Sequence, residues 1–281
     1  MSRTARRLAG ITLFLVSASL PAAEIEHTLA IGGELLWFDY REFDENDVLL
    51  DKETGPLPGF AANWQLKSPR WFLAAEAEIA PGIVAYDGQT QTGTPTRTDT
   101  RTLLFDARLL GGYRFGPAAR HRHRLYAGAG YHYWYRDILS GTASDGTSVA
   151  GLLETYQWAW LLFGTRLTLW QNPAHALQLD ARYRWMLAGT MGVDFKGYGG
   201  YDDTTLALAT EDGWRLGLTW TWSLQPDRTL SVEPYLSAWN LGDSDLATRT
   251  RNGVPTGDLP IYEPRSKTRN MGVRVLYRLR F

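Results

Sequence analysis

The 281-residue chain has no cysteine, and after residue 23 it has no long apolar run. A chain without cysteine forms no disulfide, offers no thiolate to a metal and carries no lipid on a cysteine. The mean hydropathy is −0.28, and no stretch after residue 23 approaches the roughly 20 apolar residues of a membrane-spanning helix. These absences exclude a lipoprotein, a disulfide-stapled secreted domain and a helical membrane protein.

The chain also contains few histidines and has no excess of positive charge. The chain holds 5 histidines and has a formal net charge of −1. A nucleic-acid-binding surface needs clustered positive charge, so we expect no nucleic-acid partner. The sequence also lacks the spacing patterns of metal and nucleotide sites, and we expect no cofactor and no bound metal.

The first 23 residues have the pattern of a secretory signal peptide. Three arginines precede an apolar stretch at residues 8–20, and Pro21-Ala22-Ala23 supplies small residues where a signal peptidase cuts. The apolar stretch is too short for a stop-transfer helix. We therefore expect a signal peptide at 1–23, cleaved after Ala22 or Ala23, and a mature domain at 24–281.

Aromatic residues are abundant, with 12 Trp and 14 Tyr, and many lie in alternating segments. From Met271 to Phe281 every second residue is apolar, whereas Arg274, Arg278 and Arg280 lie between them. Period-two alternation gives a β-strand one apolar and one polar face. High aromatic content with low mean hydropathy fits strands that show lipid only every second residue.

Nine further segments predict strands. They lie at 26–41, 57–67, 70–86, 103–115, 124–137, 154–170, 177–187, 214–224 and 229–240. Both faces of 154–170 are apolar in the middle, which leaves its orientation open. Pro81 and Pro234 predict a bulge or an early strand end, because proline donates no ladder hydrogen bond. The fold class predicted is all-β, an antiparallel up-and-down transmembrane β-barrel of about ten strands.

The connections between these segments fall into two classes. Those after the second, fourth, sixth and eighth segments are short. The others are long and polar, at about 42–56, 87–100, 138–153, 195–211 and 241–266. Outer-membrane barrels have short periplasmic turns and long external loops. We expect five surface loops, and both termini in the periplasm because the number of strands is even.

With this alternation, loop asymmetry and terminal phenylalanine, the chain resembles small Gram-negative outer-membrane β-barrels, in the size class of the omptin proteases and the neisserial opacity proteins. No specific family motif is matched. The resemblance implies a place in the cell outer membrane, with its lipid and lipopolysaccharide and the barrel assembly machinery as partners. It also implies that the aromatic end of the last strand is the assembly signal, here Tyr277, Leu279 and Phe281.

The polar faces of the predicted strands point many charged residues into the barrel. Charges inside a low-dielectric shell have to be paired or hydrated, and an eight-stranded barrel is just filled by its side chains. We expect a mostly filled lumen with some water. The expected charge network is structural and consists of Glu34, Glu76, Glu78, Asp106, Arg108, Arg114, Arg136, Asp180, Arg182, Arg184, Arg215, Glu233, Arg274, Arg278 and Arg280.

Enzymes of this class place catalytic groups at the rim or on the lipid face. An omptin-like site needs acids and a histidine near the outer edge. Acids are present at Asp87, Asp99, Asp194, Asp202 and Asp203, but no predicted outer loop contains histidine. The omptin motif is therefore not matched, and the Asp202-Asp203 pair is interpreted as solvated turn residues.

A lipid hydrolase needs a serine beside a histidine. His132 is the only histidine within the predicted barrel wall, where it points into the lumen with Trp134 and Arg136. No serine is placed as its nucleophile, so we interpret His132 as hydrogen-bonded to its neighbours.

The first long loop is rich in acids that resemble a cation site only superficially. They lack the glycine and the terminal glutamate of an EF-hand loop, and we interpret them as a hydrophilic loop. These acids are Asp44, Glu45, Asp47, Asp51 and Glu53.

No complete catalytic set is present, so we expect no enzyme. Three hypotheses for the function stay open. The first is a non-enzymatic surface-interaction or envelope protein that acts through its loops, which agrees best with the loop lengths. The second is a narrow channel for small solutes, anions among them because arginine is in excess. The third is an outer-membrane hydrolase with an unrecognised site that uses loop acids and His132.

Overall fold

The computed structural model describes residues 25–90, 92–116 and 123–281. The predicted signal peptide at 1–23 lies outside the described residues, so it stays a prediction. Within the described ranges, no helix is long and apolar enough to cross a membrane.

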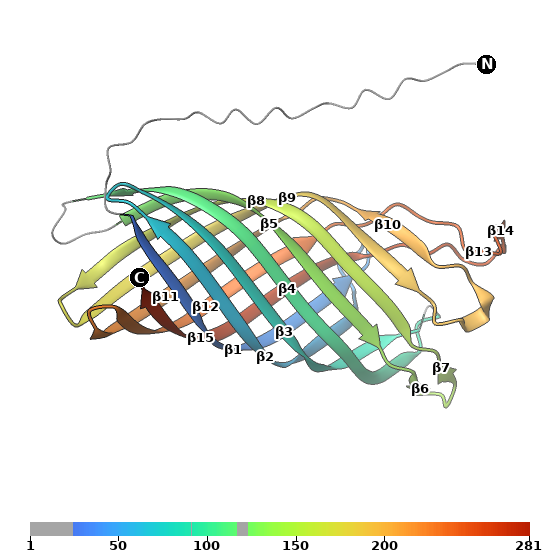
Figure 1. Cartoon of the computed structure of the whole chain (residues 1–281). Helices are drawn as coiled ribbons and strands as arrows, with labels where there is room; N and C mark the ends of the chain where they lie inside the picture. Colours follow the sequence, from blue (N-terminus) through green and yellow to red (C-terminus); the bar gives the residue numbers. More distant parts are fainter. Residues whose placement is uncertain (1–24, 91, 117–122) are drawn as a thin grey trace, which may run out of the picture.

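Ten long antiparallel strands form a sheet that closes on itself (Figure 1). Each pairs with its neighbours in sequence, and the last pairs with the first. The predicted all-β, ten-stranded up-and-down barrel is therefore confirmed. The long strands are β1 (Glu26–Phe43), β2 (Leu49–Lys67), β3 (Trp71–Gln89), β4 (Pro95–Phe115), β5 (His123–Ile138), β8 (Leu152–Gln171), β9 (His175–Asp194), β11 (Asp212–Gln225), β12 (Arg228–Leu241) and β15 (Arg265–Arg280).

The short elements lie in the longer connections, away from the C-terminus (Figure 1). We call this end of the barrel the loop end, and the end that holds Phe281 the terminal end. The short elements are β6 (Gly141–Ala143), β7 (Ser148–Val149), the 3-10 helix η1 (Tyr198–Gly200), β10 (Thr204–Leu208), β13 (Thr250–Arg251) and β14 (Val254–Pro255).

The last residue of the chain completes the closure of the barrel. The backbone N–H of Phe281 donates to the carbonyl of His27 at 3.0 Å, and the N–H of His27 donates back at 3.1 Å. Because both β1 and β15 obtain a hydrogen-bonded neighbour on each side, this seam removes the edges that a ten-stranded sheet would otherwise expose. The ring of Phe281 stacks on His27 and is largely exposed.

The strands run further toward the loop end than the sequence predicts. The connection between β1 and β2 covers only 44–48, and the one between β3 and β4 only 90–94. The expected loops at 42–56 and 87–100 are therefore mostly strand. The prediction ended each strand where its outward face becomes polar, but the backbone ladder continues beyond that point because it does not need an apolar face.

An apolar band surrounds the middle of the barrel. Its outward residues are large and exposed, as Leu35, Ile79 and Val275 illustrate. Exposed tryptophans lie near both margins, Trp37 toward the loop end and Trp71 toward the terminal end. An exposed apolar surface of this extent marks contact with lipid, and aromatic rings at its margins fit the headgroup depth.

Past this band the outward face becomes charged, at residues such as Arg41 on β1, Lys52 on β2 and Arg101 on β4. The barrel wall therefore projects beyond the apolar band at the loop end. Pro81 and Pro234 cause neither a bulge nor a strand end, since the register of β3 and β12 runs through them unbroken.

Candidate functional site in the barrel lumen

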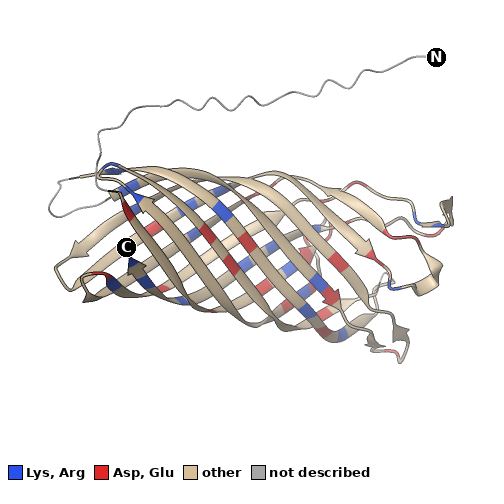
Figure 2. Cartoon of the chain, viewed as in Figure 1, with Lys and Arg blue, Asp and Glu red and all other residues tan. Residues whose placement is uncertain are grey.

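The lumen contains most of the buried charged side chains of the described residues. Acidic and basic residues lie along the strands as well as in the connections (Figure 2). Strand β5 passes through every layer, with Arg124 nearest the terminal end, then His132, Trp134 and Arg136 toward the loop end. These four residues lie in different surroundings inside the lumen.

A central ion network occupies the lumen at the level of the apolar band. Arg108 is fully buried and donates from Nε to Glu76 and from Nη1 to Asp106, both at 2.6 Å, and from Nη2 to Glu78. One guanidinium thus joins three carboxylates from β3 and β4. Because its donors are all directed at acceptors, the desolvation of the four charges is offset.

Four more arginines extend this network around the barrel. Arg182 donates to Glu76 at 2.9 Å, Arg215 to Glu233 at 2.9 Å, and Arg274 to Glu78 at 2.8 Å and Glu34 at 3.1 Å, while Arg184 lies 3.4 Å from Asp106. The network therefore links β1, β3, β4, β9, β11, β12 and β15. Its charges balance, with five guanidiniums and the five carboxylates Glu34, Glu76, Glu78, Asp106 and Glu233.

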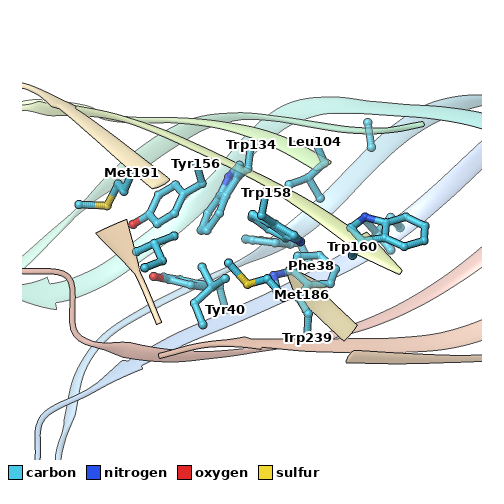
Figure 3. Close-up of a cluster of buried hydrophobic side chains, with 14 of the residues drawn as sticks. Phe38, Tyr40, Leu104, Trp134, Tyr156, Trp158, Trp160, Met186, Met191 and Trp239 are labelled. Atoms are coloured by element: carbon cyan, nitrogen blue, oxygen red, sulfur yellow. The ribbon is translucent and has the colours of Figure 1, made fainter. Parts of the chain in front are cut away.

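An aromatic layer lies on the loop side of the central ion network. Figure 3 shows its side chains packed together inside the barrel. The ring of Trp134 has no exposed surface, and its centroid lies 4.8 Å from that of Tyr40 and 4.6 Å from that of Tyr156. Ring packing at this density leaves little room for a solvent path. The layer consists of Phe38, Tyr40, Trp134, Tyr156, Trp158, Trp160 and Trp239.

His132 lies at the boundary between these two layers. It stacks on Trp158 at 4.2 Å, and its Nδ1 lies 3.4 Å from Asp106 Oδ2. Its Nε2 is buried and has no hydrogen-bond partner among the described residues. The histidine is buried in the lumen between Trp158, Trp239 and Asp106.

Beyond the aromatic layer lies an acidic cluster around a single guanidinium. Arg136 donates to four carboxylates, at 2.8 Å to Glu53, 2.7 Å to Glu42, 2.6 Å to Glu154 and 3.0 Å to Asp51. All are buried. Asp51 and Glu53 were expected in a hydrophilic loop, which is wrong: both lie in β2 and point into the barrel.

A fifth carboxylate, Glu263, enters the acidic cluster from the connection between β14 and β15. The hydroxyls of Tyr40 and Tyr156 lie 3.2 Å and 2.8 Å from its Oε1, and each also lies within hydrogen-bond distance of another carboxylate. Burial, followed by the charges of Glu42 and Glu154, raises the pKa of Glu263 well above its ordinary value. A proton on Glu263 relieves the crowding of negative charge.

The terminal end of the lumen has the opposite composition and forms a basic cluster. Arg114, Arg124 and Arg166 occupy directly opposed positions on β4, β5 and β8. Like charges that face each other across strands are unfavourable. Arg166 pairs with Asp180 at 2.9 Å, whereas neither Arg124 nor Arg278 has an ion-pair partner among the described residues.

The expected network residues thus divide among these layers. Arg114 lies in the basic cluster and donates to the backbone carbonyl of Ser68. Asp180 lies between the clusters, shared by Arg166 and Arg182. Arg280 lies at the rim, half exposed, where it donates to the carbonyl of Pro226 at 2.6 Å.

The sequence pattern did not lead us to predict several charged residues of the lumen. Arg124 has the inward parity of His132, Trp134 and Arg136 on the same strand, so the alternation of β5 contains the signal for it. Arg166 lies on the strand of ambiguous orientation. Glu263 lies in a loop, where no periodicity identifies it. The missed residues are Glu42, Lys67, Arg124, Glu154, Arg166 and Glu263.

The acids of the outer connections are engaged in loop structure. Asp202 accepts hydrogen bonds from the Thr250 hydroxyl at 2.6 Å and from the backbone N–H of Gly253 at 2.8 Å, which holds the pKa of this carboxyl below its usual range. It therefore ties the connection after β9 to the β13–β14 hairpin. In the part of the chain that the structure describes, no group of three or more potential ligands is arranged to hold a metal, and no histidine lies at the loop end.

No protein-family model matches the chain, and no curated protein sequence matches it. Among solved structures, it is similar to the outer membrane protease OmpT from Escherichia coli, with a TM-score of 0.64 and 13% identity over 92% of this chain and 96% of that one. This likeness shows the fold, that of an outer-membrane β-barrel, and nothing about activity.

Two further structures share the barrel class more loosely. The translocator domain of the autotransporter NalP from Neisseria meningitidis has a TM-score of 0.42 and 11% identity over 90% of this chain and 88% of that one. OprG from Pseudomonas aeruginosa has a TM-score of 0.38 and 9% identity over 92% and 97%. Neither likeness is close enough to support an argument.

Proposed function

We propose that the chain is an integral outer-membrane protein that acts at the cell surface through the connections at its loop end, without catalysis. The barrel is then a closed support. The observation that carries this proposal is the filling of the lumen by the central ion network, the aromatic layer and the acidic cluster.

The size of the cavities in the lumen supports the closed barrel. The cavity beside His132 has a volume of about 50 Å³, the one beside Arg278 about 30 Å³, and the one beside Trp160 about 20 Å³. Since about 10–15 Å³ accommodates one water, each of these holds a few waters at most. Such spaces favour a structural lumen over a solute path.

The loop end offers material for contacts with a partner. Leu246, Val254 and Leu259 are each more than 60% exposed, and they lie outside the apolar band, where no lipid covers them. Tyr201 donates to Asp258 at 2.8 Å, and its ring lies 4.7 Å from the guanidinium of Arg251. Exposed apolar groups on an ordered, partly charged surface fit binding to another macromolecule.

The first experiment tests where the two ends of the barrel lie. Because the chain has no cysteine, single cysteines are introduced as Asn252→Cys at the loop end and Asn172→Cys at the terminal end. A membrane-impermeant maleimide should label the first in intact cells and the second only after lysis. Labelling of Asn172→Cys in intact cells would reverse the orientation and overturn the proposal.

The second experiment tests the loop surface itself. The triple substitution Leu246→Ser, Val254→Ser, Leu259→Ser should abolish adhesion or envelope phenotypes that depend on the protein, while the barrel keeps its heat-modifiable migration. The control is Leu109→Ala, on the apolar band. If deletion of the whole chain changes such a phenotype and the triple variant behaves as wild type, the loop surface is not the functional one.

A channel for small anions is the alternative that the basic cluster favours. It requires an open path through the aromatic layer, and bilayer conductance separates it from the proposed function.

A further inference from the structure

Arg278 is a partly buried charged group that has no ion-pair partner among the described residues. Its Nε is buried and has no hydrogen-bond partner among the described residues, and none of their carboxylates pairs with it. The same is true of Arg124 Nε, and the charge of Arg124 lies within range of Arg166 and Arg278. A buried guanidinium without a counter-charge costs free energy that something in the folded protein has to offset.

The acids of this region cannot supply the counter-charge, because other arginines already engage them. Glu76 binds Arg108 and Arg182, and Glu233 binds Arg215. Asp180 is divided between Arg166 and Arg182. The terminal half of the lumen thus holds guanidiniums in excess of the carboxylates available to them.

A cavity of about 30 Å³ lies where the counter-charge is missing. Arg278 of β15 and Arg166 of β8 line it, and hydroxyls come from Thr219, Thr221 and Ser231. The lining also contains Arg182 and Arg274 and three carboxylates that are engaged in ion pairs, those of Glu76, Glu78 and Glu233. The space exceeds that needed for a single water.

The neighbours of Arg278 add unused hydrogen-bonding groups. Thr229 lies directly opposite Arg278 on β12, and the buried hydroxyl of Thr229 has no partner in the described part of the chain. Guanidinium N–H groups and hydroxyls together match the oxygens of a small oxyanion, which accept several charge-assisted hydrogen bonds.

We propose that this cavity binds a small inorganic oxyanion of the phosphate or sulfate type, between Arg166 and Arg278 and the hydroxyls of β11 and β12. The anion neutralises the basic cluster and so completes the packing of the terminal half of the lumen. The site is enclosed by the barrel, which favours a free ion over the headgroup of a lipid. It does not depend on the orientation of the barrel or on the loop surface.

The test uses the full-length mature chain, refolded in a non-ionic detergent without phosphate or sulfate. Inorganic phosphate, sulfate and chloride are each titrated at constant ionic strength, and the midpoint of thermal unfolding is followed. A ligand that binds only the folded state raises this midpoint in proportion to the logarithm of its concentration, once it exceeds its dissociation constant. Phosphate and sulfate should raise it, and chloride at equal ionic strength should raise it less.

Two substitutions and a control locate the effect. Arg278→Met should abolish the shift with phosphate, and Thr221→Val, which removes a hydroxyl that lines the cavity and keeps the shape of the side chain, should reduce the affinity severalfold. Arg97→Met removes an exposed arginine at the loop end and should leave the shift unchanged. If Arg278→Met does not fold, Thr221→Val decides.

Three results would overturn the site. They are the absence of a midpoint shift in the wild type, equal shifts with all three salts, and a shift that both lumen variants retain. In each of these cases water fills the cavity, and the proposed function at the loop end is unaffected.

Discussion

The two ends of the lumen differ in the sign of their excess charge. At the loop end, four carboxylates bind Arg136 and a fifth, Glu263, lies beside them. At the terminal end, Arg124 and Arg278 have no carboxylate partner among the described residues. Between them the central ion network is balanced. The described part of the lumen thus contains an acidic cluster built around Arg136, a basic cluster with an excess of guanidiniums, and a neutral network between them.

The effect of a lumen arginine on stability therefore depends on its surroundings. Arg136 satisfies four acceptors, so its loss leaves several buried carboxylates unpaired. Arg278 satisfies no acceptor among the described residues, so its loss removes repulsion. The same residue type therefore stabilises one end and strains the other.

The largest expected effect is that of Arg136→Met. It should lower the free energy of unfolding by about 3–5 kcal/mol, because uncompensated buried carboxylates remain. Urea unfolding of the refolded protein in lipid vesicles measures this. The control is Arg41→Met, since Arg41 pairs with Asp39 at 2.8 Å but is 45% exposed. Equal losses in the two variants would contradict the role of the acidic cluster.

The next effect is a dependence of the loop end on pH. The pKa of Glu263 is raised when its side chain lies in the acidic cluster, so the connection between β14 and β15 takes up a proton when it packs there. This packing is fully stabilised below the ordinary glutamate pKa, and the stabilisation is lost as the pH rises through the raised value. A spin label on Leu259→Cys should therefore become more mobile as the pH increases.

The substitution Glu263→Gln tests whether this carboxyl causes the pH dependence. The amide keeps the shape of the protonated side chain and does not titrate, so the label on Leu259→Cys should show no pH dependence in this background. Increased mobility on acidification, in either background, would show that the sign is wrong.

A smaller effect, of opposite sign, is expected at the terminal end. In buffer free of phosphate and sulfate, Arg278→Met should leave the free energy of unfolding unchanged or raise it slightly. The measurement is the same urea titration. A loss as large as that of Arg136→Met would mean that Arg278 already has a strong partner and would remove the contrast between the ends.

The smallest effect is expected outside the lumen. Arg97 lies 3.2 Å from Asp87, and their side chains are 83% and 59% exposed. Because water competes for such a pair, Arg97→Gln should change the free energy of unfolding by less than about 0.5 kcal/mol. A larger change would assign stability to surface pairs that this account assigns to the lumen.

The barrel itself could be predicted from the sequence because its pattern is strict. Every second residue from Met271 in β15 to the terminal Phe281 is apolar, and a strand that faces lipid accounts for that alternation together with the inward arginines. The strand ends could not be predicted, since β2 begins at Leu49, eight residues before the predicted start at residue 57. Those ends are determined by backbone hydrogen bonds between strands, which extend past the apolar band into the part of the barrel that water surrounds.

The layers of the lumen were only partly predictable. Parity identifies Arg108 and Glu76 as inward residues, but it says nothing about which charges meet. Trp160 and Met186 flank a register shift between β8 and β9, which changes the parity of β9 beyond it. Glu263 depends on the path of a loop. Which side chains meet across the lumen depends on how the sheet closes into a barrel, and a local sequence pattern does not contain that information.

The filled lumen is tested most directly by recording conductance across a planar lipid bilayer that contains the refolded wild-type protein. Heat-modifiable migration of the same preparation shows that the barrel is folded. A filled lumen should give no conductance steps at moderate voltage in potassium chloride. Stable steps with a preference for anions would contradict it and would make the barrel a channel whose path passes the basic cluster.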